Sequence, residues 1–158
     1  TTGTVTLASG TISGTGAGTL TGSSFTLQSG TVSGILGGTG TVTKNTAGTV
    51  ILSGANSYTG STTISAGTLQ VNTNNALGTA ASGTTVANGA VLKLNNVNYT
   101  TAEPVTLNGS GISNGGALLN SGTSTFATSI SMLRKAAFTS LTCRPEPIAH
   151  CHCGMPTT

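Results

Sequence analysis

Three cysteines and two histidines gather near the end of the chain, at Cys143, His150, Cys151, His152 and Cys153. Thiolate and imidazole groups are ligands that suit zinc or copper. Structural zinc sites, however, space their ligands about two to four residues apart so that they converge on the ion, whereas adjacent side chains point in different directions. We therefore predict no metal site and no cofactor, and we keep these five residues as weak metal-ligand candidates.

The chain has two acidic residues, Glu103 and Glu146, and no aspartate. Calcium-binding loops need several carboxylates, and glycosidases place two carboxyl groups on either side of one bond. A serine nucleophile needs a base to take its proton, but both histidines lie in the tail. The sequence therefore predicts a protein that is not an enzyme. A polysaccharide-acting β-helix enzyme is kept as an alternative, and it would depend on Glu103.

Two tyrosines could act as exposed aromatic platforms for glycans, Tyr58 within the segment SGANSYTGSTT and Tyr99 further along. Each also fits the alternative of a core residue that stacks on its neighbours inside a repeat, and we favour that interpretation. Phe25 and Phe126 lie at the inward positions of alternating runs and are predicted to be core residues.

Charged residues make up only 4% of the chain, and the formal net charge of +3 is scattered. Nucleic-acid binding normally requires a clustered basic face with aromatic residues for stacking. We therefore predict no nucleic-acid partner, and we expect Lys44 and Lys93 to be solvated side chains that point outward.

Threonines at alternate positions suggest another kind of binding. Regular outward threonine arrays on a flat solenoid face can order water, as in some ice-binding proteins. Along this sequence the pairs recur irregularly, and threonine is common in β-structure, so ice binding is kept only as a minor alternative. The pairs are Thr4/Thr6, Thr41/Thr43 and Thr123/Thr125.

The composition indicates how these residues are positioned. Few charges and a slightly positive mean hydropathy disfavour simple disorder, and an aromatic content of 3% disfavours an ordinary globular core. Threonine, valine and isoleucine suit a pleated surface, and the 24 glycines suit tight turns. The sequence therefore favours a β structure dominated by backbone hydrogen bonds.

The body of the chain repeats. Residues 6–14 read TLASGTISG and residues 26–34 read TLQSGTVSG, an offset of 20, and similar units follow at intervals of about 23 to 26 residues as SAGTLQV, NGAVLKL and NGGALLN. Each unit holds a short run in which apolar residues alternate with polar ones. The runs are bordered by corner signals such as Asn88-Gly89, Asn108-Gly109 and Asn114-Gly115.

Units of this size predict an all-β fold, a parallel β-helix (β-solenoid) of roughly five or six coils over residues 1–130. Stacked coils bury the alternating apolar side chains, such as Val5/Leu7, Phe25/Leu27, Leu69/Val71, Leu92/Leu94 and Val105/Leu107. An up-and-down barrel or sandwich, and an unfolded linker, are the alternatives.

Residues 131–158 form a compositionally distinct tail. This segment holds every cysteine, histidine, arginine and methionine of the chain. We expect it to be weakly structured or disordered, and we favour a frame-shifted or non-native end over a native metal-binding segment.

Residues 42–71 read VTKNTAGTVILSGANSYTGSTTISAGTLQV. This segment resembles the passenger-associated repeat of bacterial autotransporters and large autotransporter adhesins, in which LSGAN-x-YTG and AGTL are typical. The resemblance extends in style through NNALG, NGAVLKLNN and EPVTLNGSGISNGGALLNSG. It departs from the family at Asn45-Thr46, where a glycine is usual, and we expect a local change at a corner there.

The resemblance implies a fragment of a secreted passenger displayed on the outer membrane of a bacterial cell and carried across it by a translocating barrel that this chain lacks. It implies that the parallel β-helix is right-handed, and it brings no catalytic residues. We expect an adhesive or spacer stalk. Its expected partners are glycans or like rods, and association with like rods would make it a homo-oligomer. A self-assembling extracellular fibre is the alternative.

Overall fold

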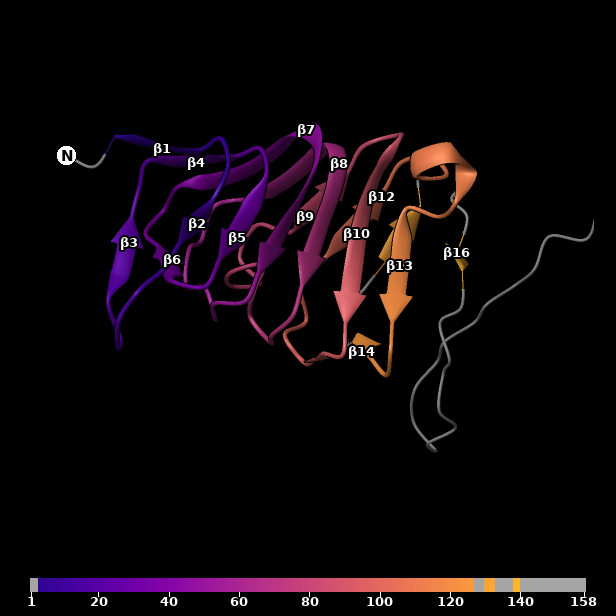
Figure 1. Cartoon of the computed structure of the whole chain (residues 1–158). Helices are drawn as coiled ribbons and strands as arrows, with labels where there is room; N and C mark the ends of the chain where they lie inside the picture. Colours follow the sequence, from indigo (N-terminus) through magenta and orange to yellow (C-terminus); the bar gives the residue numbers. More distant parts are fainter. Residues whose placement is uncertain (1–2, 127–129, 133–137, 140–158) are drawn as a thin grey trace, which may run out of the picture.

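The computed structural model describes residues 3–126, 130–132 and 138–139. Over these residues the backbone winds into a parallel β-solenoid of about five turns, with the N-terminal coil at the left of Figure 1. The one helical turn within the described residues is the 3-10 segment η1 (Ile112–Asn114). The predicted all-β solenoid is confirmed, while the division of the chain at residue 130 stays a prediction.

Most strands are short, as expected where each coil turns several corners. Two are long, β7 (Thr41–Leu52) and β8 (Thr62–Val71), and they pair with each other in the middle of the stack. The other strands, in chain order, are β1 (Thr4–Leu7), β2 (Thr11–Ile12), β3 (Thr19–Thr21), β4 (Ser24–Leu27), β5 (Gly30–Val32), β6 (Ile35–Gly37), β9 (Thr84–Val86), β10 (Ala90–Asn95), β11 (Asn98–Tyr99), β12 (Val105–Leu107), β13 (Leu118–Ser121), β14 (Thr125–Phe126), β15 (Ile130–Met132) and β16 (Phe138–Thr139).

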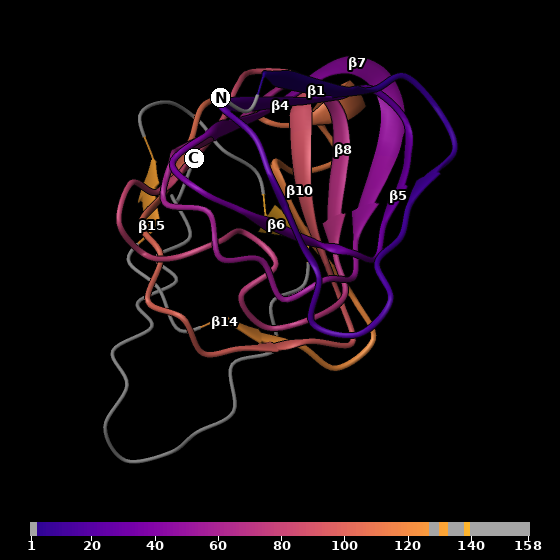
Figure 2. The same cartoon turned by 90° about the vertical axis from the view of Figure 1, so that its left-hand side faces the viewer.

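Each coil has three sides, which the view along the stack in Figure 2 shows as a closed outline. The first side is the parallel ladder of β1, β4, the first half of β7, the first half of β8, β9, β12 and β15. The second side is the ladder of β2, β5, the second halves of β7 and β8, β10, β13 and β16. The third side carries the short pairs β3–β6 and β11–β14.

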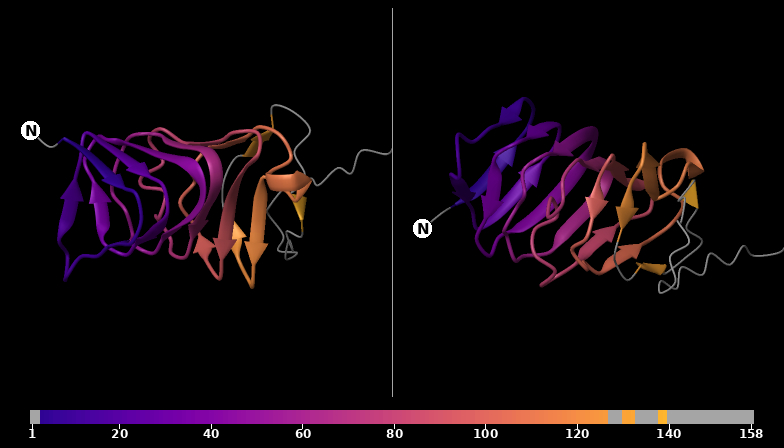
Figure 3. Two further views of the ribbon diagram at one scale, coloured as in Figure 1. Left: turned by 45° about the horizontal axis from the view of Figure 1, so that its top comes forward. Right: turned by 90° about the horizontal axis from the view of Figure 1, so that it is seen from below.

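The ladders have the register that the repeats predicted. Thr6 pairs with Thr26, which is the offset of 20 between the first two units. Leu92 pairs with Leu69 before it and with Leu118 after it, which are the longer intervals of the later units. Coils of unequal length therefore stack in one continuous ladder, and their extra residues lie in the connections between the paired strands, which Figure 3 shows as loops of the ribbon.

The core is a set of four inward columns, in which equivalent residues of successive coils stack on one another. Side chains in the columns are mostly apolar and largely buried. The first column is Val5, Phe25, Val42, Thr62, Thr84, Val105 and Ile130, and the second is Leu7, Leu27, Lys44, Ile64, Val86 and Leu107. The third is Val50, Leu69, Leu92 and Leu118, and the fourth is Ile12, Val32, Leu52, Val71 and Leu94.

The corners use residues that accept a left-handed backbone. Two predicted corner signals are confirmed, because Gly89 and Gly109 have φ angles of 78° and 88°. At the third signal the left-handed residue is Asn114, with φ 61°, and not the glycine that follows it. Asparagine tolerates this conformation better than most residues with a side chain.

A buried asparagine ties three coils together on the third side. Asn56 is 3% exposed. Its Oδ1 accepts a hydrogen bond of 2.8 Å from the backbone N of Leu36, and its Nδ2 donates one of 2.6 Å to the carbonyl oxygen of Ala76. The amide thus satisfies one backbone group from the coil before and one from the coil after.

The third inward column predicts where truncation is destabilising. Leu69 is fully buried between Val50 and Leu92, so Leu69→Ala leaves a cavity and is expected to lower the free energy of unfolding by about 2–5 kcal/mol. Thr68→Ala removes the outward neighbour on the same strand and is expected to change the free energy of unfolding by no more than about 0.5 kcal/mol. Urea unfolding followed by circular dichroism measures both. Equal effects would contradict the inward and outward assignment.

Candidate functional site

The predicted metal-ligand candidates, Cys143, His150, Cys151, His152 and Cys153, lie outside the described residues. Within the part of the chain that the structure describes, no group of three or more His, Cys, Asp or Glu side chains is placed to hold a metal ion.

Tyr58 and Tyr99 are both fully buried. The ring centroid of Tyr58 lies 6.5 Å from that of Phe25, and the ring centroid of Tyr99 lies 5.0 Å from that of Phe126. The favoured interpretation of both tyrosines as stacked core residues is confirmed. Phe25 is also fully buried, and Phe126 is partly buried and packs against the core.

Two threonines replace apolar residues in the first inward column, and each is paired from the third side of the coil. The hydroxyl groups of Tyr58 and Thr62 share a hydrogen bond of 2.7 Å. In the next coil Thr84, which stacks on Thr62, donates a hydrogen bond of 2.6 Å to Oε1 of Glu103. We call these four residues the interior polar cluster.

Glu103 is 1% exposed, so it lies inside the solenoid and not on a surface open to a polymer. Its Oε2 is buried and has no hydrogen-bond partner among the described residues. Burial raises the pKa of this carboxyl from 4.5 to about 7, against the lowering effect of the hydrogen bond from Thr84. Burial also raises the pKa values of Tyr58 and Tyr99, and the charge of Glu103 adds to both increases.

The prediction that Lys44 points outward is wrong. Lys44 follows the inward residue Val42 at an interval of two, so the alternation of the strand turns it into the second column, where it is fully buried. Its Nζ donates to the carbonyl oxygen and hydroxyl of Thr46 and, at 3.2 Å, to the carbonyl oxygen of Ala66. Burial lowers its pKa. Lys93, in contrast, is partly exposed on the outer surface of β10, as predicted.

The ammonium group of Lys44 fills an irregularity in the backbone. The pairing of β7 with β8 shifts register between Lys44 and Thr49. This is the local change expected at Asn45-Thr46. Gly67 lies opposite with φ 70°, and a Cβ there would lie 2.3 Å from the carbonyl oxygen of Thr46. The glycine therefore leaves room for the bulge, in which the carbonyl oxygen of Thr46 binds the lysine.

Residues 111–115 read Gly-Ile-Ser-Asn-Gly, a spacing shared with serine-nucleophile turns. Here Ser113 lies in η1, is exposed and has φ 50°. The turn joins β12 to β13 and does not lead from a strand into a helix. Since the described residues include no histidine, the structure gives this serine no imidazole base.

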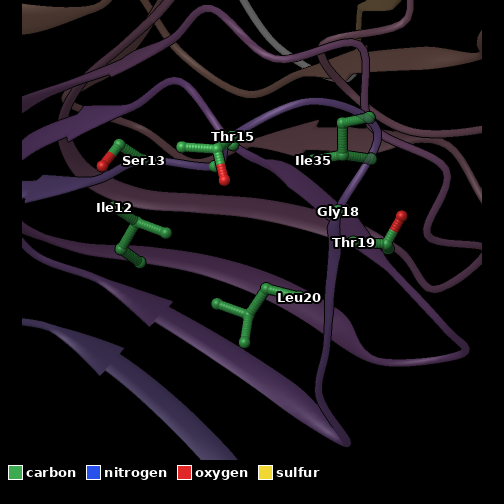
Figure 4. A pocket seen from close by; sticks show the side chains of 9 residues that line it. Ile12, Ser13, Thr15, Gly18, Thr19, Leu20 and Ile35 are labelled. Carbon is green, nitrogen blue, oxygen red and sulfur yellow. The ribbon is translucent and has the colours of Figure 1, made fainter.

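A hollow of about 350 Å³ lies beside the first coils (Figure 4). Its polar side chains are the hydroxyl groups of Ser13, Thr15 and Thr19, and no charged residue lines it. Ile12 and Leu20 contribute apolar surface.

The outer surface of the first side is a continuous array of hydroxyl side chains. One outward column holds six threonines in register without interruption, and a second column of four residues runs beside it. We call this array the threonine face; it lies on the ladder whose first strands, β1 and β4, run along the upper edge of Figure 2. Its first column is Thr6, Thr26, Thr43, Thr63, Thr85 and Thr106, and its second is Thr4, Ser24, Thr41 and Ser61.

Comparison with known proteins identifies the middle of this stack. Residues 42–71 match the model of the passenger-associated-transport-repeat family. The chain carries an autotransporter passenger repeat. No curated protein and no solved structure matches the chain. The passenger repeat coincides with β7, β8 and the segment between them.

The matched repeat implies a secreted or cell-surface protein and fits a fragment of an autotransporter passenger. In the described part of the chain, no helix has the length and apolar character needed to span a membrane. The signature of the passenger repeat is now explained by contacts, because Leu52 and Leu69 fill inward columns, Asn56 joins coils, and Gly67 faces the bulge.

The buried carboxyl of the interior polar cluster predicts a dependence of stability on pH. The folded protein favours the protonated form of Glu103, so its contribution is complete below about pH 4.5 and is lost as the pH rises to about 7. We expect the free energy of unfolding to fall by about 3 kcal/mol over that interval. Urea unfolding across this pH range measures the change.

Two variants isolate the contribution of Glu103. Glu103→Gln keeps the shape without ionising and is expected to abolish the glutamate's share of the pH dependence. Thr84→Val removes the hydrogen bond that lowers the pKa, so the loss of stability is expected to extend to higher pH. An unchanged pH profile in Glu103→Gln would contradict the assignment.

The two lysines of the solenoid are expected to differ in chemical reactivity. An amine-reactive acetylating reagent should modify Lys93 in the folded protein and leave Lys44 unmodified, because the amine of Lys44 is buried and bonded to carbonyl oxygens. In urea both should react. Mass spectrometry of the peptides measures the modification, and equal labelling in the folded protein would show that Lys44 is accessible.

Proposed function

We propose that this chain is part of a surface passenger that acts as a non-catalytic adhesive or spacer stalk. One observation carries the proposal: the passenger repeat at residues 42–71 is embedded in an uninterrupted parallel stack and not in a separate module. Coils on both sides of the repeat continue the same ladders.

The spacer role follows from the geometry of the stack. Parallel strands lie about 4.8 Å apart, so each coil extends the rod by that distance. Every coil is fixed to the next by backbone hydrogen bonds on two long sides and by four packed columns. Such a rod holds whatever it carries at a defined distance from its base.

The distribution of charge supports a non-catalytic role. Within the described residues the charged side chains are Lys44, Lys93 and Glu103, and the first and last of these are buried. The enzyme alternative required Glu103 at an exposed site, which the structure does not provide. The exposed surface therefore consists largely of uncharged polar side chains repeated from coil to coil.

An adhesive role fits that repetition. Weak contacts that recur along a rigid rod act together, because each contact raises the effective concentration for the next. Glycans and like rods are the proposed partners, since both present repeated hydroxyl or amide groups to such a surface.

Display of the whole chain on bacterial cells tests the proposal. Cells that carry the chain should attach to surfaces or settle faster than cells with the carrier alone, and the chain should stand off the cell as a rod by electron microscopy. The purified chain should release no reducing ends from plant or bacterial polysaccharides. Release of reducing ends that is lost in Glu103→Gln would overturn the non-catalytic assignment.

A further inference from the structure

We propose that the threonine face binds the surface of crystalline water, so that the passenger can attach to ice. This inference deepens the adhesive part of the proposed function and rests on it. The threonine face is built from residues that the structure brings into register although they are unevenly spaced along the sequence.

The regularity of the threonine face exists only in the fold. Successive members of its first column are separated by intervals that differ from coil to coil, so the sequence alone gives no constant period. In the structure Thr6 pairs with Thr26, Thr26 with Thr43, and Thr43 with Thr63. The ladder continues through Thr85 to Thr106. The predicted pairs Thr4/Thr6 and Thr41/Thr43 belong to this array, whereas Thr125 lies on the third side in β14.

Another outward column of the same solenoid serves as an internal comparison. On the second side, successive positions of the outward column that includes Thr31 and Lys93 are occupied by hydroxyl, aliphatic, amide and charged side chains. Its members are Thr11, Thr31, Ile51, Gln70, Lys93 and Leu119. An outward strand position in this fold therefore does not require threonine. The constancy of the threonine face points to a constraint from outside the fold.

The spacing and chemistry of the threonine face suit an ordered water layer. Hydroxyl groups recur about every 4.8 Å along the rod and about every 6.7 Å along a strand, as strand geometry dictates. Each hydroxyl group donates one hydrogen bond and accepts up to two, as a water molecule can. The adjacent methyl groups offer apolar surface, beside which water is already restricted in orientation. Repetition in two directions is the property of a crystal surface.

The surroundings favour ice over a glycan as the partner. The described residues that make up the threonine face include neither a charged nor an aromatic side chain. A glycan surface would be expected to use aromatic rings, but Tyr58 and Tyr99 are buried. A charged side chain would keep its own hydration shell and disturb an ordered water layer, and the partly exposed lysine of the solenoid, Lys93, lies on the second side.

The threonine face is also held in place before it meets a partner. Its β-branched side chains have restricted rotamers, and the Ser24 hydroxyl donates a hydrogen bond of 2.9 Å to the Thr4 hydroxyl in the neighbouring coil. The strands beneath are fixed by the ladders of the first side. Binding therefore orders little that is not already ordered, which favours affinity for a regular surface.

The test measures uptake of the purified whole chain into a slowly growing ice crystal, together with the gap between melting and freezing temperatures. Thr63→Lys places a charge in the middle of the threonine face. Thr31→Lys makes the same change at a similarly half-exposed strand position on the second side. Circular dichroism and thermal unfolding confirm that both variants fold.

The amounts of the wild-type chain and of Thr31→Lys taken up into ice are expected to differ by no more than about twofold. Uptake of Thr63→Lys should be lower by roughly fivefold or more, because the charge lies at the centre of the binding surface. Exclusion of the wild-type chain from ice, or equal uptake of the two variants, would overturn the inference. Binding of the wild-type chain to crystalline cellulose or chitin without uptake into ice would assign the face to glycans instead. If displayed cells still attach to other surfaces, the proposed function survives the loss of the ice inference.

Discussion

The hydrogen bonds between coils run along the axis of the rod, and each coil forms them only with the coils immediately before and after it. This parallel pairing fixes which residue stacks on which, and so it determines the inward columns, the outward columns and the corners together. A coil can gain residues at a corner without disturbing the ladder, as the unequal intervals around Leu92 show. A residue gained within a strand would turn the following side chains to the opposite face. The register is therefore the constraint on which the other features depend.

The polar residues of the solenoid divide into two sets that differ in what satisfies them. Inside, three buried side chains each form hydrogen bonds to particular partners: Thr84 binds Glu103, Lys44 binds carbonyl oxygens beside a bulge, and Asn56 joins the coils on either side. Burying a polar group without a partner costs free energy. The Oε2 atom of Glu103 has no partner among the described residues, and burial raises the pKa of this carboxyl group. Outside, the hydroxyl groups of the threonine face repeat without individual partners in the core. The first set is satisfied within the core, and the second is free to serve a surface.

The fold could be predicted from the sequence because stacking makes repeated units visible, and because alternation of apolar residues marks the inward face. The burial of Lys44 was within reach of the same rule, since it stands two residues after the inward Val42, but its charge suggested solvent. The burial of Glu103 could not be predicted from alternation, because no repeated unit includes this residue and its partner Thr84 comes from an earlier coil. The threonine face was predicted only in part, from the pairs Thr4/Thr6 and Thr41/Thr43, and for another reason. Its order appears only when coils of different length are aligned on their inward residues, and a search for a constant interval passes over it.

The uneven corners and the axial hydrogen bonds together determine how such a rod responds to force. A pull along the axis loads the bonds between the outermost coil and its neighbour, while the remaining interfaces stay closed until that coil has left. The rod should then lengthen in steps, each releasing a chain segment of up to about 3.5 Å per residue. Because the intervals between paired residues differ from coil to coil, with the interval from Leu92 to Leu118 among the longest, the steps would differ in length. A stalk of this kind would absorb the energy of a sudden load by unfolding its coils one after another. The coils that remain folded would still present an edge of unpaired strands, on which the released chain can refold.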